Sequence, residues 1–269
     1  MIRPSRLVAF ALLLLLAPAA HAADPAEIVA AKHALQQAIN ASDSKQVLAA
    51  RARFEALRAA EPQSGALATW VATADWRAVS LLAYRDRDKK AAKKQCKAGI
   101  AMAERAAQLD PSLPEAYAIR AALLGLSIGF GNPMVAGMTT GPKIDAAEKQ
   151  ALKLAPENPR TALIEGIGIL HKPSFVGGGA DKALAKLREA IVLFDAETVA
   201  DSTAPDWGRD DAHVWAGQAA MKLSDYAAAR EHYRRALEIN PDNSWVRAIL
   251  LPAAEKALAA KGGDREDAS

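Results

Sequence analysis

One short pattern recurs along this chain and limits what it can fold into. An alanine is followed three positions later by an apolar residue, and two positions after that by a proline. Proline lacks an amide hydrogen, so each copy predicts the end of a helix. The three clear copies are Ala106–Pro111, Ala151–Pro156 and Ala236–Pro241. Leu57–Pro62 is a weaker copy, and 190–195 keeps the alanine and the leucine but ends in Asp195.

The spacing of these helix ends predicts stacked helix pairs. The end points at 62, 111, 156, 195 and 241 are separated by 49, 45, 39 and 46 residues. Helix pairs that recur along a chain bury their apolar faces against their neighbours, which favours a solenoid over a single bundle. The expected pairs span 25–61, 65–110, 114–155, 159–196 and 208–240, followed by a capping helix over 243–261.

The pattern between these end points is helical throughout. Alanine and leucine recur at helical spacing from Asp24 to about Lys261, and no window alternates polar with apolar residues as a strand would. With 51% apolar and 24% charged residues, the chain is expected to fold. The fold class is therefore all-α. The chain divides into a leader over 1–22, a solenoid over 23–261 and a mobile tail over 262–269 that contains a double glycine.

Residues 210–243 resemble the tetratricopeptide repeat, a helix-turn-helix unit of roughly 34 residues. The tryptophan slot of the repeat holds His213 instead, with Trp215 two positions later. The matching small, aromatic and proline positions are Gly217, Tyr226, Ala229, Tyr233, Ala236 and Pro241. The resemblance implies a right-handed superhelical solenoid of about five such helix pairs with a C-terminal capping helix. It also implies a concave groove, lined by the first helix of each pair, that holds a peptide or protein partner.

Aligning the helix pairs on their small-residue positions places the candidate partner-binding residues in this groove. With Ala121, Gly166 and Gly217 as the small slots, the cations Arg160, Lys222 and the imidazole of His171 would meet a carboxylate or another anion. The alternative is that these are ordinary solvated helix positions. The groove candidates are Glu115, Ala118, Ala122, Arg160, Leu163, Ile167, His171, Asp211, Val214, Gln218, Met221 and Lys222.

Two long connections within helix pairs form a second candidate region. Both 129–141 and 171–179 contain Pro-x-x-x-Gly, and parallel stacking of the pairs would bring the two loops to one edge. The candidate residues are Asn132, Pro133, Pro173 and Gly177. These loops would form a lid over a small ligand, or they would fold their apolar side chains onto the core. The apolar side chains concerned are Val135, Met138, Phe175 and Val176.

The sequence offers little that indicates catalysis, metal or cofactor chemistry. Three aspartates and His213 fall within 206–213, but helix capping by Asp210 explains the cluster more simply than a metal site. No nucleophile has a base and an orienting group at a recognisable spacing, so we expect no enzyme, no metal and no cofactor. Cys96, the one cysteine, is either a buried helix residue or a thiol activated by neighbouring lysines.

The charge balance and the leader limit which partners and which compartment are possible. The 34 basic and 31 acidic residues include Arg3 and Arg6 of the leader, which leaves 32 against 31 and disfavours nucleic-acid binding. The leader joins these arginines to an apolar run over 7–16 and to Ala20-His21-Ala22, a typical export signal. Its apolar run is about half of the roughly 20 residues that a membrane span needs, so we expect no stable membrane insertion. The sequence thus predicts a periplasmic or secreted, non-enzymatic scaffold that binds a protein or peptide of the cell envelope. The alternative is a periplasmic protein that binds a small ligand or assists a transporter.

Overall fold

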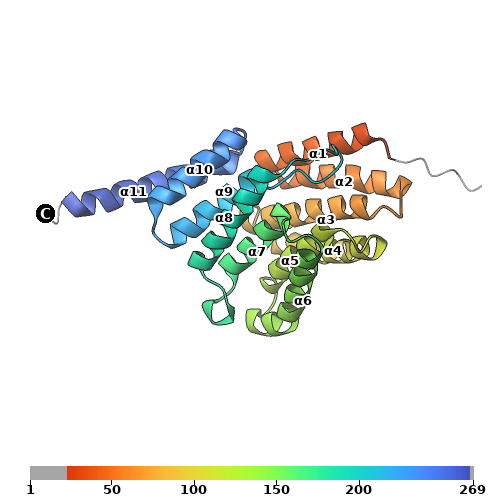
Figure 1. The fold of residues 1–269 in the computed structure, drawn as a ribbon, viewed down its shortest axis with the longest axis horizontal. Helices are drawn as coiled ribbons and strands as arrows, with labels where there is room; N and C mark the ends of the chain where they lie inside the picture. Colours follow the sequence, from red (N-terminus) through yellow and green to blue (C-terminus); the bar gives the residue numbers. More distant parts are fainter. Residues whose placement is uncertain (1–22, 267–269) are drawn as a thin grey trace, which may run out of the picture.

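The computed structural model describes residues 23–266 and is built from helices alone over this range (Figure 1). The expected leader over 1–22 lies outside the described residues. Five helix pairs follow one another: α1 (Pro25–Asn40) with α2 (Ser44–Ala60), α3 (Gly65–Ser80) with α4 (Lys89–Leu109), α5 (Pro114–Ile128) with α6 (Pro133–Leu154), α7 (Pro159–His171) with α8 (Ala180–Ala196), and α9 (Arg209–Lys222) with α10 (Tyr226–Ile239). A single helix, α11 (Leu251–Glu266), ends the described chain. Short helical segments at Leu81–Arg85, Ser174–Val176 and Val246–Leu250 complete it. The predicted all-helical solenoid of five pairs is confirmed.

Local sequence signals set the ends of these helices. α4, α6 and α10 each end two residues before the proline of the repeated motif. Several helices begin after a polar residue whose side chain accepts hydrogen bonds from first-turn amides. At α7 the Asn158 side chain accepts from the amides of Arg160 and Thr161, and Pro159 takes the first helical position. The end of one helix, the short turn and the start of the next helix therefore follow directly from the residues at each junction.

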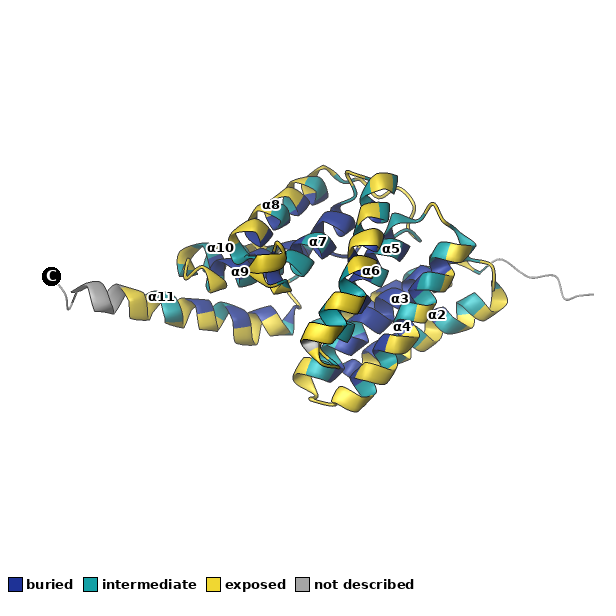
Figure 2. Ribbon diagram, turned by 90° about the horizontal axis from the view of Figure 1, so that it is seen from below, coloured by how far each residue is buried: buried dark blue, intermediate teal, exposed yellow. Residues whose placement is uncertain are grey.

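The first helices of the pairs form the inner layer. α3 packs on α5, α5 on α7, and α7 on α9, whereas the second helices make at most marginal contacts with one another. When the first helices of successive pairs pack closely and the second helices do not, the stack curves, and the first helices line its inner side. Burial agrees, since α3 is buried on nearly all sides while α2, α4 and α6 each expose one face (Figure 2).

One predicted loop is wrong, and one helix is longer than expected. The connection between α5 and α6 covers only 129–132, because Asn132 caps α6 and Pro133 begins it. The expected loop over 129–141 is therefore mostly helix, and Pro142 lies inside that helix. At the other end, α11 continues to Glu266, whereas the capping helix was expected to end at 261. The mobile tail over 262–269 stays a prediction.

The two ends of the solenoid touch. The side-chain amide of Asn40, at the end of α1, exchanges hydrogen bonds with that of Asn240 at 3.1 and 2.9 Å. The hydroxyl groups of Ser42 and Ser244 lie 3.3 Å apart. Figure 1 shows the end of α1 beside the junction of α10 and α11. The sequence predicted an open trough, but here the first pair closes against the last repeat.

Candidate partner-binding surface

A segment of the chain itself lies on the inner face of the solenoid. Residues 197–208, called the strap below, connect α8 to α9 and run past α1 (Figure 1). The Lys32 ammonium donates to the carbonyl oxygens of Ser202 and Ala204 at 2.6 and 2.7 Å. The Trp70 indole N–H donates to the carbonyl oxygen of Thr203 at 3.1 Å. Three successive strap carbonyls are thus bound by side chains of α1 and α3.

The C-terminal end of the strap is anchored by an aromatic side chain. Trp207 is 7% exposed, and its ring centre lies 5.5 Å from that of Trp76. The Arg77 guanidinium lies 4.3 Å from the Trp76 ring centre and 5.4 Å from that of Trp207, and it forms an ion pair with Asp211. Stacking on two indoles and pairing with a carboxylate fixes this arginine in place.

The N-terminal end of the strap is held by a buried ion pair. The two terminal nitrogens of Arg160 donate to the two carboxylate oxygens of Glu197 at 2.5 and 3.1 Å. The Arg160 side chain is 2% exposed and its partner is 20% exposed. Asp206 adds a third carboxylate contact, 3.0 Å from the Lys32 ammonium. Cations of the inner helices therefore meet acids of the strap at both ends.

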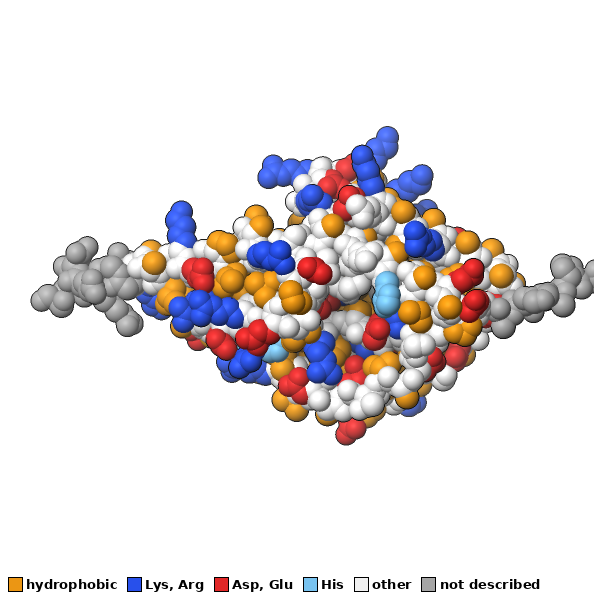
Figure 3. Space-filling view, turned by 90° about the horizontal axis from the view of Figure 1, so that it is seen from above, with side chains coloured by type: hydrophobic (Ala, Val, Ile, Leu, Met, Phe, Trp, Pro, Cys, Tyr) orange, Lys and Arg blue, Asp and Glu red, His pale blue; other side chains and the backbone are white. Residues whose placement is uncertain are grey.

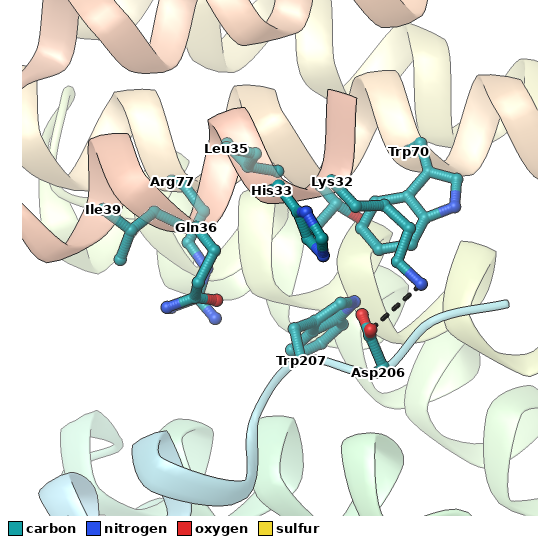
Figure 4. A pocket seen from close by; sticks show the side chains of 10 residues that line it. Lys32, His33, Leu35, Gln36, Ile39, Trp70, Arg77, Asp206 and Trp207 are labelled. Carbon is teal, nitrogen blue, oxygen red and sulfur yellow. Dashed lines mark ion pairs between the residues drawn. The ribbon is translucent and has the colours of Figure 1, made fainter. Parts of the chain in front are cut away.

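A small pocket opens between α1, α3 and the strap. His33 and Gln36 point from α1 toward Trp207, and the Lys32–Asp206 ion pair closes one side (Figure 4). Its volume is about 170 Å³. Ordinary small-molecule sites are larger, about 300 to 1,000 Å³. The fold thus leaves a niche beside the strap rather than a full ligand cavity.

Several of the predicted groove residues are committed to contacts within the chain. Glu115, Arg160, Leu163 and Asp211 are all buried. The Glu115 carboxylate accepts a hydrogen bond from the Asn158 amide at 2.7 Å. The anion that Arg160 meets within the chain is Glu197, so the prediction that Arg160 binds a partner's anion requires that Glu197 be displaced. Register alone placed these side chains correctly on first helices but did not reveal what covers them.

Of the other predicted groove residues, Ala118 and Val214 are buried as well, whereas Ile167, His171, Gln218 and Lys222 remain accessible. The His171 ring is 5.6 Å from that of Trp215, and Trp215 is 6.4 Å from Trp245. The Lys222 ammonium donates to the Leu170 carbonyl oxygen at 3.0 Å. We call this accessible part of the inner layer the open face, made of Ile167, His171, Trp215, Gln218, Lys222 and Trp245. The two tryptophans were missed as site residues, although the position of Trp215 next to the groove position Val214 was an available signal.

The electrostatics of the open face favour a neutral imidazole. Loss of hydration and the nearby Lys222 cation both lower the pKa of His171 below its usual 6.5. His171 is therefore uncharged at neutral pH, and Lys222 provides the positive charge. Seen from above, the molecule as a whole has a hollow near its centre, with acidic, basic and histidine side chains around it (Figure 3). An anionic group bound at the open face would meet Lys222 first.

The loop candidates Asn132, Pro173 and Gly177 are exposed. Asn132 caps α6, and Pro173 and Gly177 flank the short helix over 174–176, where Gly177 adopts a φ of 91°. The side chains of Met134, Met138 and Phe175 are 78%, 77% and 87% exposed. The interpretation that these connections fold apolar groups onto the core is therefore wrong. Both turns emerge at the lower edge in Figure 1.

The acidic cluster over 206–213 is dispersed by the fold. Asp210 accepts from the Asn240 amide at 2.7 Å and Asp211 pairs with Arg77, while Asp206 pairs with Lys32. Asp210 does not cap the helix as predicted, because α9 begins after Gly208 without a side-chain cap. Each carboxylate of the cluster thus points to a different partner.

His213, the last member of that cluster, pairs with His232. Their Nδ1 atoms are 3.2 Å apart, so one ring donates and the other accepts, and the pair holds no second proton at this contact. Burial and the neighbouring His213 lower the pKa of His232 to about 4. Free histidine titrates near 6.5, so between these values the unfolded chain binds more protons than the folded chain.

The free energy of unfolding should therefore fall as pH drops from about 6.5 to about 4. We expect His232→Phe to flatten this dependence, because the group with the lowered pKa is removed. Thermal unfolding of the variant at several pH values checks this, with His33→Gln, which alters an exposed histidine on α1, as the control. Each 1 kcal/mol lost should lower Tm by roughly 2–4 °C. Equal pH profiles for His232→Phe and the wild type would assign the acid sensitivity to other groups.

Cys96 is a buried helix residue, and the activated-thiol alternative is wrong. Its sulfur lies 3.2 Å from the carbonyl oxygen of Leu123, to which the thiol donates. Burial raises the pKa of the thiol to about 12. The lysines on either side of it in the sequence are on the solvent side of α4 and do not activate it.

Comparisons with known proteins agree with this geometry. The tetratricopeptide-repeat family model matches residues 210–243, which hold the α9 and α10 pair. The fold is similar to the HusA haemophore from Porphyromonas gingivalis, with 21% identity, a TM-score of 0.59, and coverage of 74% of this chain and 91% of that one. It is also similar to TTC0263, a thermophilic TPR protein from Thermus thermophilus, with 16% identity, a TM-score of 0.57, and coverage of 85% of this chain and 99% of that one.

No curated protein sequence matches the chain. Among residues 23–266 no helix is both long and apolar enough to span a bilayer. Folds of this type generally serve as scaffolds for protein interaction rather than as catalysts. Residues 210–243 thus match a tetratricopeptide repeat, and the chain as a whole shares the helical-solenoid fold of a solved tetratricopeptide-repeat protein.

Proposed function

We propose that this protein is an exported, non-enzymatic scaffold that binds an extended segment of another cell-envelope protein along its inner layer. The observation that supports this most directly is the strap. The inner face already holds a stretch of protein, through hydrogen bonds from Lys32 and Trp70 to the backbone carbonyls of a turn over 201–204. A surface that binds backbone groups in this way suits a peptide segment without helix or strand structure of its own.

The open face offers the partner a continuation of that surface. Trp215 and Trp245 present aromatic area, and Lys222 supplies a charge for a carboxylate. Half-buried Ile167 adds an apolar contact on α7. These groups favour a segment that combines apolar or aromatic side chains with an acidic group.

The compartment and the class of ligand rest on separate arguments. The leader composition supports export to the periplasm or beyond, where a partner would belong to the envelope. The alternative of a small-ligand binder has less support. Its expected lid over 129–141 is mostly helix, and the pocket of about 170 Å³ is smaller than ordinary ligand sites.

The open face can be tested by substitution. We expect the double change Trp215→Ala with Lys222→Glu to reduce capture of the partner at least about tenfold, since it removes aromatic contact and reverses the charge. The measurement is a cross-linking pull-down from envelope extract, with the captured protein identified and its affinity then measured with purified components. Lys153→Glu, on an exposed position of the second helix α6, is the matched control. Equal capture by both variants and the wild type would exclude the open face.

A further inference from the structure

The strap is longer than its position in the fold requires. The corresponding connections at 61–64, 110–113 and 155–158 use four residues each, whereas the strap uses twelve. Its middle part, residues 198–202, is exposed, and no helix packs over it. A long connection without secondary structure inside a compact domain more often has a function than a linking role alone.

The groups that hold the strap are fixed by the rest of the fold. Trp70 stacks on Phe54 with ring centres 5.2 Å apart and planes within 2°. The Arg160 guanidinium lies 5.7 Å from the Phe194 ring centre, and Lys32 is only 6% exposed. Trp70 is therefore positioned by core residues. Lys32 and Arg160 lie against aromatic rings of the core, while their ionic partners belong to the strap. A surface with these groups held beside the core has the character of a receptor.

The chemistry of this receptor is specific. Lys32, Arg77 and Arg160 bring cations from three first helices to one face, in a chain whose overall charges nearly cancel. They meet carboxylates at positions 197 and 206, together with the ring of Trp207. The backbone contacts accept any chain that makes such a turn, while these three side-chain contacts select an acidic one with an aromatic anchor.

We propose that the inner face of α1, α3 and α7 is a binding site for an acidic segment that has a turn in its middle and a tryptophan near its C-terminal end, and that residues 197–208 occupy it within the chain. A partner segment of the same chemistry takes the place of the strap. This inference rests on the proposed function, since it names the kind of segment that the scaffold binds. The strap then acts as a built-in competitor that admits only partners able to replace its contacts.

Tethering determines how the competition must be measured. A segment joined at both ends is present at an effective concentration of the order of millimolar. A free peptide will therefore bind the intact chain weakly and will bind well only when the strap is removed. The probe is a fluorescent peptide with the sequence of residues 197–208, and the receptor is the full chain with 197–207 replaced by eleven glycine and serine residues.

We expect this peptide to bind the strap-replaced protein at least about tenfold more tightly than the intact protein, by fluorescence anisotropy. A control peptide has Gln, Asn and Ala in place of Glu197, Asp206 and Trp207, and should bind at least about tenfold more weakly. Absence of peptide binding below about 1 mM to a folded, strap-replaced protein would overturn the proposal.

A second variant keeps the test decisive if the replacement does not fold. Asp206→Asn with Trp207→Leu weakens the strap but leaves the Arg160–Glu197 pair and an apolar group in the tryptophan site. It should bind the labelled peptide more tightly than the intact chain does, and equal binding would count against the proposal. If the peptide does not bind and partner capture still depends on Trp215 and Lys222, the inference about the strap fails while the proposed function stands.

Discussion

Replacing Gly217 by valine is expected to unfold the last repeat, with a loss of about 3 kcal/mol or more. Gly217 lies on α9 directly against the ring of Tyr233 on α10. A Cβ atom at this position would come within 2.7 Å of the ring Cδ1 and 2.9 Å of Cζ, closer than such atoms ever approach. Tyr233 is 1% exposed and has no space into which to move. Urea unfolding followed by circular dichroism, with tryptophan fluorescence to report on the last repeat, measures the loss.

Gly125→Ala provides the matched control for this prediction. Gly125 is also helical, on α5, but a Cβ atom there meets nothing within 4 Å. Alanine should therefore stabilise the chain by roughly 0.5–1 kcal/mol, the usual gain when a helical glycine is replaced. A Gly217→Val protein as stable as the wild type would contradict the close packing of α9 on α10.

The last repeat was also the part most predictable from the sequence. Gly217, Tyr233 and Pro241 stand at fixed separations within one hairpin, so a local pattern specifies both the packing and the helix end. The short connection after α5 was predictable as well, because Asn132 followed by Pro133 is typical of a helix start. The Pro-x-x-x-Gly pattern at 133–137 suggested a loop, and tertiary context overrode that local signal.

The strap could not be predicted because its contacts join distant parts of the chain. Lys32 meets the carbonyl of Ser202 across 170 positions, and Trp70 meets that of Thr203 across 133. Aligning the helix pairs indicates that Arg160 and Ile167 both face inward. The alignment does not show that a connecting segment covers Arg160 and leaves Ile167 accessible. The closure of α1 on the last repeat is of the same kind, since it depends on the accumulated curvature of five pairs.

Removing the carboxylate of Glu197 should be the second large change, because it leaves a charged guanidinium without a partner. Arg160 is 2% exposed, and both of its terminal nitrogens donate to Glu197. Breaking a buried ion pair from one side usually costs about 3–5 kcal/mol. Glu197 is 20% exposed, so water reaches part of the site, and we expect Glu197→Ala to cost about 3 kcal/mol in urea unfolding.

A double change separates the loss of the pair from the loss of the strap. Adding Arg160→Met to Glu197→Ala removes the unpaired charge and leaves an apolar side chain of similar length beside Phe194 and Trp207. We expect the double variant to recover most of the stability, because buried ion pairs are often replaced by apolar groups without loss. Glu238→Ala, which breaks the exposed pair with Arg235, should cost less than about 1 kcal/mol. If the double variant is as unstable as Glu197→Ala, the strap stabilises the fold through its other contacts, and the unpaired charge is not the cause.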